Sequence, residues 1–361
     1  MKTSIIGLMS GTSLDGLDIA YCTFEQTPDL SWHYQIICAE TIDYSETWKS
    51  RLSNLDAASA LTFAKTDADL AYYFGTEVNK FIQKNNIKPQ AIASHGQTIF
   101  HQPGNGFTTQ IGNGAYIHAI TGIPVISDFR TVDVGLGGNG APLVPVGDEL
   151  LFHEFDYCLN LGGFANISFT KDHQRIAFDI CAVNMVLNRL CAVLDLPYDD
   201  NGNIARNHGP DSELLKALSD LSFYKQPAPK SLGKEWVEAE VMPILDRFTL
   251  STEIKIATFT EHVAQQISYI LHSNFSLFHT QKMLVTGGGA FNGYLIERIH
   301  KFAKGNIEII VPEAELVMFK EALIFAFLGL LRINGGVNSL CKVTGASKDS
   351  IGGAVYGWLE V

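Results

Sequence analysis

The feature that most constrains this chain is a strand–turn–strand pattern that occurs twice. The first copy has apolar runs at residues 5–9 and 17–24, joined by a turn of glycine, serine, threonine and aspartate. The second copy has residues 157–160 and 166–169 on either side of the turn LGGFA. This spacing is typical of β-hairpins. Two hairpins of the same layout predict two lobes of related topology, and 361 residues are enough for two cores.

Helical and extended patterns alternate along the rest of the chain. Apolar spacing predicts helices over residues 64–84, 261–275 and 320–333, and strands at residues 91–93, 124–130, 176–179 and 283–285. This alternation predicts an α/β fold, in which ligands bind at the carboxyl ends of the strands. A segment rich in glycine and proline at 135–145 is a candidate crossing between lobes. We therefore expect residues 1–130 and 336–361 to form one lobe and residues 131–335 to form the other.

The turn of the first hairpin has the GxxxxG spacing of a phosphate-binding P-loop. The Lys-Ser/Thr pair of a P-loop does not follow it, and a strand follows where a P-loop needs a helix, so we exclude a Walker motif. The backbone N–H groups of the turn and the hydroxyls of Thr12 and Ser13 could still hold a phosphate, although ordinary hairpins also have such turns. Residues 135–140 match a dinucleotide-binding loop in spacing, but Pro142 and Pro145 prevent a helix from beginning there.

Two further patterns consist of small residues. Three consecutive glycines at 287–289 follow the strand at 283–285, and they let the backbone approach a flat or anionic ligand closely. We therefore predict that they contact a nucleotide. Ala322, Ala326 and Gly329 lie along one side of an apolar helix, which allows close packing against a second helix. Such packing is either purely structural or part of a hinge between the lobes.

Composition excludes several classes of partner. A net charge of −12 is unfavourable for binding nucleic acid or an anionic membrane, which require a basic surface. A nucleotide is not excluded, because backbone N–H groups can hold it. We find no secretory signal, and the longest apolar run, 322–331, is about half as long as a bilayer requires. The six cysteines form no CxxC pair, so we expect reduced thiols in a cytoplasmic protein with no membrane partner.

Eight segments together resemble the anhydro-N-acetylmuramic acid kinase family of the actin, Hsp70 and sugar-kinase superfamily. They are GLMSGTSLDGLD at 7–18, SHGQT at 94–98, SDFR at 127–130, GAPLVP at 140–145, NLGGFANIS at 160–168, KSLGKE at 230–235, VTGGGAFN at 285–292 and KEALIFAF at 320–327. The resemblance spans nearly the whole chain, and its first segment is highly specific. It implies a two-lobed actin/hexokinase-like fold, which is a duplicated ribonuclease H-like fold with a central cleft. It also implies an enzyme that uses ATP and Mg²⁺ to open the 1,6-anhydro ring of a peptidoglycan-derived amino sugar and to phosphorylate O6.

The resemblance also implies roles for individual residues. The phosphates of ATP would contact Gly11, Thr12, Ser13, Leu14, Asp15, Gly16, Leu17 and Asp18 in the first hairpin, and Gly162 and Gly163 in the second. The nucleoside would contact Gly287, Gly288, Gly289 and Asn292. Asp179 would be the catalytic base, and His95, Arg130, Asn184 and Glu321 would bind the sugar. Asp15 or Asp18 would hold Mg²⁺, mostly through water.

Several of these residues also have a purely structural explanation. Asp179 could cap the helix that follows it, and His95 could be a hydrogen-bonded structural histidine. Arg130 could lie at the surface, but an arginine at a strand end also suits the lactyl carboxylate of muramic acid. Glu321 begins the predicted helix at 320–333, where a carboxylate interacts favourably with the helix dipole.

One segment departs from the pattern of the family. The family follows its catalytic aspartate with a small-residue turn of the Thr-Gly-Pro type, whereas this chain has ICAV at 180–183. The departure leaves two alternatives beside the anhydro-sugar kinase. One is an ordinary hexose or amino-sugar kinase, and the other is a nucleotide-gated module that binds a sugar without turnover. A homodimer is expected from the resemblance alone.

Overall fold

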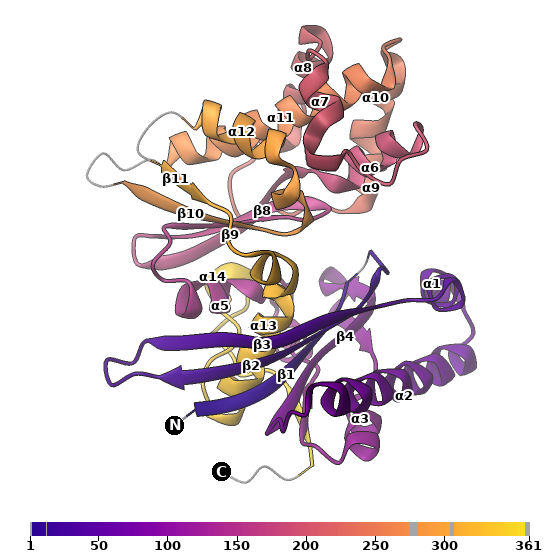
Figure 1. Cartoon of the computed structure of the whole chain (residues 1–361), viewed down its shortest axis with the longest axis vertical. Coiled ribbons are helices and arrows are strands. Elements are labelled where there is room, and N and C mark those ends of the chain that lie inside the picture. The colour runs from indigo at the N-terminus through magenta and orange to yellow at the C-terminus, as the bar shows by residue number, and fades with distance from the viewer. Residues whose placement is uncertain (1, 12, 275–279, 304–306, 358–361) are drawn as a thin grey trace. The chain divides into compact units, whose positions relative to one another are not determined.

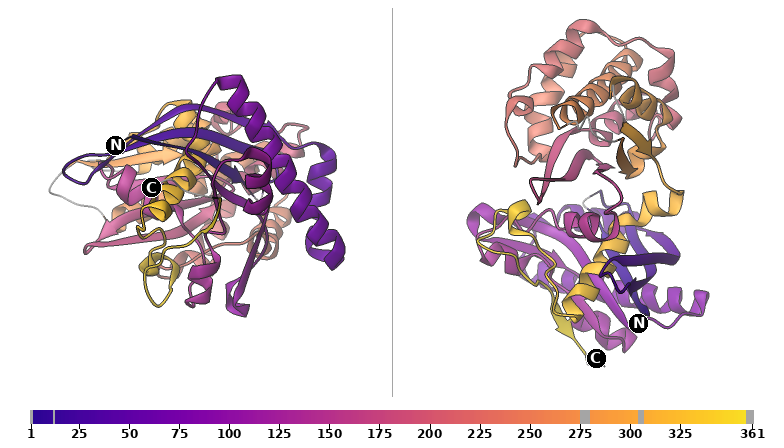
Figure 2. Two further views of the ribbon diagram at one scale, coloured as in Figure 1. Left: turned by 90° about the horizontal axis from the view of Figure 1, so that it is seen from below. Right: turned by 90° about the vertical axis from the view of Figure 1, so that its left-hand side faces the viewer.

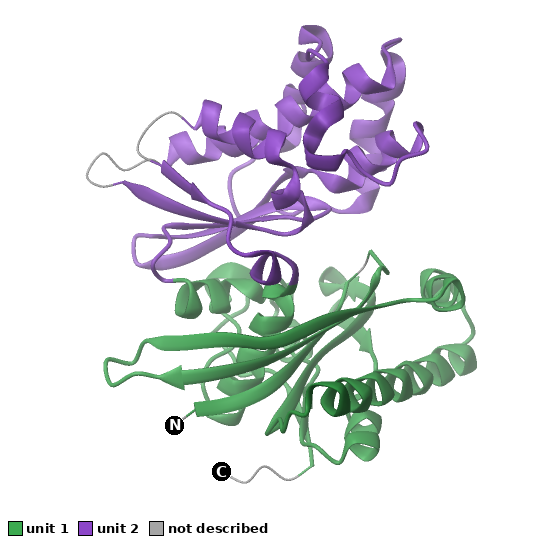
Figure 3. Ribbon diagram, viewed as in Figure 1, with its two compact units in different colours: residues 1–152, 319–361 green, residues 153–318 purple. Residues whose placement is uncertain are grey.

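The computed structural model describes residues 2–11, 13–274, 280–303 and 307–357. The chain divides into two compact units, which Figure 3 distinguishes by colour. Unit 1 contains residues 1–152 and 319–361, and unit 2 contains residues 153–318. Each unit is built on one β-sheet with helices packed against it (Figures 1 and 2). The predicted α/β class is therefore confirmed.

Unit 1 has a seven-stranded sheet of order β12-β6-β4-β1-β2-β3, and β5 pairs with β4. The strands are β1 (Lys2–Ser10), β2 (Gly16–Gln26), β3 (Trp32–Asp43), β4 (Ala91–Gln102), β5 (Phe107–Ile111), β6 (Val125–Ser127) and β12 (Ala354–Tyr356). The helices are α1 (Glu46–Ser53), η1 (Leu55–Ala57), α2 (Ala60–Asn85), η2 (Pro103–Asn105), α3 (Gly114–Thr121), α4 (Thr131–Gly135), α5 (Val144–Leu151) and α14 (Cys341–Thr344). Helix α13 (Ala314–Ile333) begins in unit 2 and continues into unit 1.

Unit 2 has a five-stranded sheet of order β11-β10-β7-β8-β9. The strands are β7 (Tyr157–Leu161), β8 (Phe164–Lys171), β9 (Gln174–Ala182), β10 (Gln281–Thr286) and β11 (Ile307–Ile310). The helices are α6 (Asn184–Ala192), η3 (Asp200–Gly202), α7 (Asn203–Asn207), α8 (Ser212–Ser219), η4 (Ser222–Lys225), α9 (Lys234–Trp236), η5 (Val237–Val241), α10 (Met242–Arg247), α11 (Thr252–Ser273), η6 (Gly288–Phe291) and α12 (Gly293–Phe302).

The two sheets repeat one topology. In unit 1, β1 is antiparallel to β2 and parallel to β4, β2 is antiparallel to β3, and β4 is parallel to β6. In unit 2, β7, β8, β9, β10 and β11 take the same order and directions as β1, β2, β3, β4 and β6. The predicted hairpins are β1–β2 and β7–β8. The duplicated fold inferred from their similar layout is therefore confirmed.

Helix α2 shows how the local sequence sets these elements. The hydroxyl of Ser59 accepts the N–H of Thr62 at the first turn, and Asn86 ends the helix in a left-handed conformation. Phe74 and Val78 lie on the predicted apolar face and are fully buried against the sheet. The predicted helix over 261–275 corresponds to the longer α11, and the end of the prediction, Phe275, lies outside the described residues.

Helix α13 covers the other face of the sheet in unit 1. Side chains alternate along β1, so Gly7 points away from the face that α2 covers. A Cβ atom on Gly7 would overlap the carbonyl oxygen of Ala322, and a Cβ atom on Gly329 would lie 2.6 Å from the Cβ atom of Ala93 on β4. The small residues of this helix therefore pack against a sheet, and the expectation that they approach a second helix is wrong.

The boundaries of the units differ from the predicted lobes because α5 and most of α13 pack on the sheet of unit 1. Residues 131–152 and 319–335 belong to unit 1, whereas the sequence placed them in the second lobe. Helix α5 packs on β3, and the rings of Tyr34 and Phe152 lie 5.2 Å apart. Phe327 of α13 packs at 5.4 Å from Phe24 of β2. The glycine-rich segment at 135–145 is thus internal to unit 1.

Replacing Gly7 should test the approach of α13 to β1. We expect Gly7→Ala to lower the free energy of unfolding by at least about 2 kcal/mol, because the added methyl group overpacks a helix against a strand. Gly104→Ala is the matched control, since no atom lies within 4 Å of its added Cβ atom. Urea unfolding followed by circular dichroism gives both values. Equal midpoints for Gly7→Ala and the parent would contradict this packing.

Candidate functional site

A buried hydrogen-bond network holds the base of the first hairpin turn. The hydroxyl of Ser10, at the end of β1, donates to Oε1 of Gln97 on β4 at 2.5 Å. It also lies 2.6 Å from the hydroxyl of Tyr44, which donates to it. Burial raises the pKa of Tyr44, so this hydroxyl keeps its proton. The network joins β1 and β4 where their parallel pairing ends, which is the edge where ligands bind in sheets of this kind.

The turn itself covers residues 11–15. Leu14 has a left-handed conformation with φ of 58°, and its N–H donates to the carbonyl oxygen of Gly11 at 3.2 Å. Ser13 and Asp15 are exposed, and Thr12 lies outside the described residues. Leu17 is fully buried in the core of unit 1. The predicted stretch 11–18 therefore contains an accessible turn followed by residues that build the strand.

Gly16 and Asp18 belong to β2. A Cβ atom on Gly16 would lie 2.5 Å from the carbonyl oxygen of Ile42, so the pairing with β3 requires a glycine there. The hydroxyl of Thr41 on β3 donates to Oδ1 of Asp18 at 2.6 Å. Burial raises the pKa of Asp18, the Thr41 hydrogen bond opposes this shift, and the charge of Asp15 adds to it. A divalent cation would stabilise two carboxylates that influence each other in this way.

The residue types around the turn fit a magnesium ion of the kind that accompanies a nucleotide. Among the residues that the structure describes, no three His, Cys, Asp or Glu side chains form a metal-binding group. Mg²⁺ bound with nucleotide phosphates keeps several waters and takes only one or two carboxylates. Asp15 and Asp18 can supply that number.

His95 and Arg130 form a pair just beyond Ser94 and Ser127, where the parallel pairing of β4 with β6 ends. The Nε2 atom of His95 lies 2.8 Å from Nη2 and 3.1 Å from Nε of Arg130, so it must accept these hydrogen bonds. The proton of the ring is then on Nδ1, which donates to the carbonyl oxygen of Gly96 at 2.8 Å. Burial, and then the charge of Arg130, lower the pKa of His95 to about 3. His95 is therefore a neutral imidazole that orients the guanidinium group.

The three nitrogen atoms of the Arg130 guanidinium group bond to two residues, Nε and Nη2 to His95 and Nη1 to Gly140. Nη1 donates to the carbonyl oxygen of Gly140 at 2.6 Å. The N–H of Gly140 in turn donates to the buried carboxylate of Asp133 at 2.7 Å. Burial lowers the pKa of Arg130 to about 10, against the opposing charges of Glu321 and Asp133, so the group stays charged at neutral pH. Nη1 and Nη2 each carry a second N–H, which no hydrogen bond among the described residues uses.

Glu321 faces this guanidinium group from α13. Burial raises the pKa of Glu321, and the charge of Arg130 is the main opposing influence. Helix α13 begins at Ala314, so Glu321 lies two turns into the helix and not at its start. The helix dipole, which falls off within the first turn, does not explain this carboxylate.

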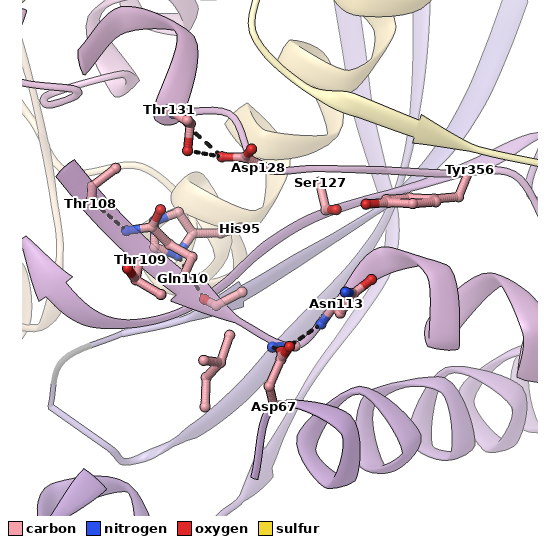
Figure 4. Close-up of a pocket in the computed structure, with 13 residues that line it drawn as sticks. Asp67, His95, Thr108, Thr109, Gln110, Asn113, Ser127, Asp128, Thr131 and Tyr356 are labelled. Atoms are coloured by element: carbon pink, nitrogen blue, oxygen red, sulfur yellow. Dashed lines mark hydrogen bonds between the residues drawn. The ribbon is translucent and has the colours of Figure 1, made fainter. Parts of the chain in front are cut away.

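His95 also lines a pocket of about 240 Å³ in unit 1, which Figure 4 shows in close-up. Its walls come from the ends of β4 and β6, from β5 and from the segments around Asp67, Asn113 and Tyr356. Most of the side chains that line it are polar. None of these pocket residues except His95 is in the predicted site.

Asp179 lies on β9 in unit 2, beside a β-bulge. The pairing of β9 with β8 shifts between Asn166, opposite Asp179, and Ala165, opposite Cys181, so one residue of β9 has no partner. Bulges of this type redirect side chains and are common next to active sites. The N–H of Leu232 donates to Oδ2 of Asp179 at 2.8 Å, and the N–H of Asp179 donates to the carbonyl oxygen of Lys230 at 3.0 Å.

The environment of Asp179 favours a strong base. Burial raises the pKa of its carboxyl group, and the hydrogen bond from Leu232 partly opposes the shift. Asp179 does not cap α6, which has Val183 at its N-cap position. The backbone segment around Lys230 is itself anchored, since Nζ of Lys230 donates to the carbonyl oxygen of Phe223 at 3.1 Å and lies 4.5 Å from the centre of the Phe223 ring.

The segment that departs from the family pattern is part of the core. Residues 180–183 are all buried, and the first three extend β9 to Ala182. The N–H of Val183 donates to the carbonyl oxygen of Gly163 at 2.8 Å, and that of Asn184 donates to Gly162 at 3.2 Å. The first N–H groups of α6 therefore bind the turn of the second hairpin. Cβ atoms on Gly162 and Gly163 would meet nothing closer than 3.5 Å, so packing does not require these glycines.

The three glycines after β10 have different surroundings. Gly287 has φ of 81°, and its Cβ atom would lie 2.8 Å from the carbonyl carbon of Leu161. A Cβ atom on Gly289 would lie 2.8 Å from Cβ of Leu161, so both glycines are required by the packing against β7. A Cβ atom on Gly288 would have no neighbour closer than Nδ2 of Asn184 at 3.7 Å. Gly288 is thus a glycine that the fold does not require.

Gly288 and Gly289 line a pocket of about 370 Å³ in unit 2. The predicted residues Asn184 and Asn292 line it too, and Oδ1 of Asn292 accepts the N–H of Leu295 at the start of α12. Asn184 thus lies beside the glycine turn predicted for the nucleoside, although the sequence assigned it to the sugar. The pocket also has two exposed aromatic rings, Tyr198 and Phe291.

Sequence reasoning missed residues that act through the backbone or lie in irregular loops. Leu232 contacts Asp179 by its N–H alone, which no residue type reveals. Asp133 and Gln97 are buried and hold Gly140 and Ser10, but an isolated Asp or Gln in a sequence carries no such signal. Tyr198 lies in a loop whose place in the fold only the structure gives.

No helix in the described ranges is long and apolar enough to cross a membrane.

Comparisons with known proteins show which family the chain is similar to. A family model described as anhydro-N-acetylmuramic acid kinase matches residues 3–357. The chain is 33% identical over 377 residues to anhydro-N-acetylmuramic acid kinase of Haemophilus influenzae, with 97% of each chain covered. It is 35% identical over 373 residues to that of Pseudomonas fluorescens, covering 97% of this chain and 98% of the relative.

A solved structure titled as a ROK family glucokinase from Streptomyces griseus in complex with glucose and AMPPNP is similar with a TM-score of 0.40 at 13% identity. That likeness covers 90% of this chain and 98% of the glucokinase. The match of the family model over nearly the whole chain, with relatives at these identities, shows that the chain belongs to the anhydro-N-acetylmuramic acid kinase family.

Proposed function

We propose that this chain is a cytoplasmic, ATP-dependent kinase that opens the 1,6-anhydro ring of anhydro-N-acetylmuramic acid and phosphorylates O6. The products are N-acetylmuramic acid 6-phosphate and ADP, and the reaction belongs to peptidoglycan recycling. The observation that carries the proposal is Asp179, a partly buried carboxylate with a pKa raised by desolvation, which the N–H of Leu232 holds in place. Membership of the family supports the identity of the sugar.

The proposed reaction needs one base. Asp179 takes a proton from water as the water oxygen forms a bond to C1 of the sugar and the C1–O6 bond breaks. O6 leaves with the electron pair of that bond and attacks the γ-phosphorus, which releases ADP. No acid is needed to protonate O6, because phosphorus captures it. A carboxylate desolvated by burial is a stronger base than one in water, which suits this role.

Different groups of the site suit different parts of ATP. The pocket beside Gly288 and Gly289, with Tyr198 and Phe291, suits the nucleoside, because aromatic rings and an open backbone accept a flat base. The turn at 11–15 offers backbone N–H groups and hydroxyls to phosphates, and Gly163 offers a further N–H. The N–H of Gly162 donates to the carbonyl oxygen of Phe164 at 3.1 Å, so this glycine contributes close backbone approach. Mg²⁺, when bound with ATP, would neutralise phosphate charge, and Asp15 or Asp18 would hold it largely through water.

The pair of His95 and Arg130 suits the acidic part of the sugar. The remaining N–H groups on Nη1 and Nη2 of Arg130 point along the end of the guanidinium group, where a lactyl carboxylate can accept both. His95 keeps the guanidinium plane fixed and carries no charge of its own. Glu321, opposite Arg130, balances the charge when the sugar is absent.

The stereochemistry of the product tests the proposed function. The protein is incubated with MgATP and anhydro-N-acetylmuramic acid, and rapid proton NMR follows C1. Because the C1–O6 bond lies on the β face, water must enter from the opposite face, so the α anomer of the 6-phosphate should form first. Parallel reactions with glucose and N-acetylglucosamine test the ordinary-kinase alternative. Early β anomer would contradict the one-base mechanism, and binding of the anhydro sugar without any product would favour the binding module.

Replacing the proposed base should abolish turnover. We expect Asp179→Asn to lower kcat at least ~100-fold, since a general base contributes that much, while ATP affinity stays unchanged. The amide oxygen can still accept the N–H of Leu232, so the local fold should survive. Asp172→Asn, an exposed aspartate in the turn between β8 and β9, is the matched control. If Asp179→Asn kept more than a tenth of the parent kcat, another group would have to be the base.

Adding one methyl group at Gly288 should weaken the binding of ATP without destabilising the fold. The free protein has room for the Cβ atom, so thermal stability should match that of the parent. A nucleoside in the pocket would collide with it, and we expect KM for ATP to rise about tenfold, equivalent to about 1.4 kcal/mol. Gly209→Ala is the control, because it also has open space around its Cβ position in unit 2. An unchanged KM for ATP in Gly288→Ala would remove this pocket from the nucleotide site.

A further inference from the structure

The pocket beside His95 in unit 1 has the position and size of a ligand subsite. It lies where the parallel pairing of β4 with β6 ends, and its volume is about 240 Å³. In open α/β sheets, ligands bind at the carboxyl ends of parallel strands such as these two. Figure 4 shows that its polar side chains come from α2, β4, β5, β6 with the segment that follows it, β12 and the N-terminus of α3.

Ser127 supplies an unused hydroxyl in this pocket. The residue is only 8% exposed, and its Oγ atom has no hydrogen-bond partner among the described residues. The Oγ atom is not closed off in the core, so a ligand in the pocket can reach this hydroxyl and form a hydrogen bond with it. Figure 4 shows the hydroxyl ends of Ser127 and Tyr356 turned toward one another. A Cβ atom on Gly114 would lie 2.6 Å from Oγ of Ser127 and 2.9 Å from the Tyr356 ring, so the glycine keeps this space open.

The charges of the lining select the kind of ligand. Asp67 and Asp128 place two carboxylates in the wall, and His95 is uncharged there. Oδ1 of Asp67 accepts the N–H groups of Gly112 and Asn113 at 2.7 and 3.1 Å. No Lys or Arg side chain lines the pocket. A phosphate or a carboxylate is therefore disfavoured, whereas hydroxyl and amide groups find both donors and acceptors.

The backbone at Asp128 is also consistent with a binding role. Asp128 has φ of 60°, a left-handed conformation that is uncommon for a residue other than glycine. Its Oδ1 atom accepts the hydroxyl of Thr131 at 2.5 Å, which holds the strained turn. Residues in such conformations are concentrated at functional sites. The turn directs the chain from Ser127, in the pocket, to Arg130, which contacts Nε2 of His95.

We propose that this pocket binds the uncharged face of the sugar substrate, the part that carries its hydroxyl and acetamido groups. The proposal rests on the proposed function and deepens it. His95 lies between two subsites, with the cationic Arg130 for the carboxylate and the polar pocket for the neutral groups. Ser127 and Tyr356 are the specificity-determining residues, because their hydroxyls bind the ligand and not the fold.

The test measures binding and turnover separately. Calorimetry with anhydro-N-acetylmuramic acid gives Kd for the parent, Ser127→Ala and Tyr356→Phe, and steady-state kinetics gives KM for the sugar and for ATP. Each loss of a hydroxyl should weaken sugar binding about tenfold and leave KM for ATP unchanged. Tyr116→Phe, on the exposed side of α3, is the matched control. Both substitutions remove one oxygen without adding volume, so the fold should be retained.

The outcomes are distinguishable from failure of the proposed function. If the parent binds the sugar but forms no phosphorylated product, the proposed kinase activity fails, and the variants still decide the pocket by their Kd values. Parent-like sugar affinity in both variants would overturn the pocket proposal while leaving the kinase proposal intact. Failure of the parent to bind the sugar would overturn it as well. A rise in KM for ATP alone would assign the pocket to the nucleotide and also overturn it.

Discussion

The close approach of α13 to β1 determines where several chemical groups of unit 1 lie. The backbone of Gly7 leaves no room for a Cβ atom beside the carbonyl oxygen of Ala322. Glu321 directly precedes Ala322, so the helix cannot move away from the strand without moving this carboxylate. The charge of Glu321 acts on Arg130, which is also fixed by His95 and Gly140. A packing constraint in the core thereby sets the distance between two opposite charges of the candidate site.

The same steric argument separates two kinds of glycine. At Gly7, Gly16, Gly287 and Gly289, a Cβ atom would collide with backbone or with a core side chain. At Gly11, Gly162, Gly163 and Gly288, it would lie at ordinary contact distances or farther. The second group is found in the three turns that the resemblance assigns to ATP. Open space alone does not mark a ligand site, since Gly104 and Gly209 have it as well. What distinguishes these four glycines is that they lie in the turns that the resemblance assigns to ATP, where a glycine lets the backbone approach a ligand closely.

The sequence predicted the parts of the structure that follow from local patterns. Alternating apolar residues and a small-residue turn were enough for the β1–β2 and β7–β8 hairpins, and helical spacing was enough for α2. The limits of the units could not be predicted, because the position of α13 depends on the contacts of Gly7 and Gly329 with residues distant in the sequence. The position of Asp179 on β9 could be predicted, but its hydrogen bond from Leu232 could not, since that contact uses the backbone. The site residues that carry charge were recognisable by type, whereas Ser127 and Tyr356 were not.

Burial is the common physical cause of the unusual protonation behaviour in both units. It disfavours the charged form of each group, so it raises the pKa of Asp179 and Glu321 and lowers that of His95. The protein opposes this effect selectively. Asp179 receives one backbone N–H, which stabilises its ionised form and only partly opposes the effect of burial.

The N-terminus of α6 gives the contrasting case. Its first N–H groups could have bound an anion, but they donate to the carbonyl oxygens of Gly162 and Gly163. The buried segment at 180–183 extends β9 up to this point and brings the helix start against the second hairpin turn. The first N–H groups of α6 are therefore not available to a phosphate near this turn. The segment at 180–183 thus connects two parts of the candidate site. Asp179 directly precedes it, and the start of α6, which follows it, binds the carbonyl oxygens of Gly162 and Gly163.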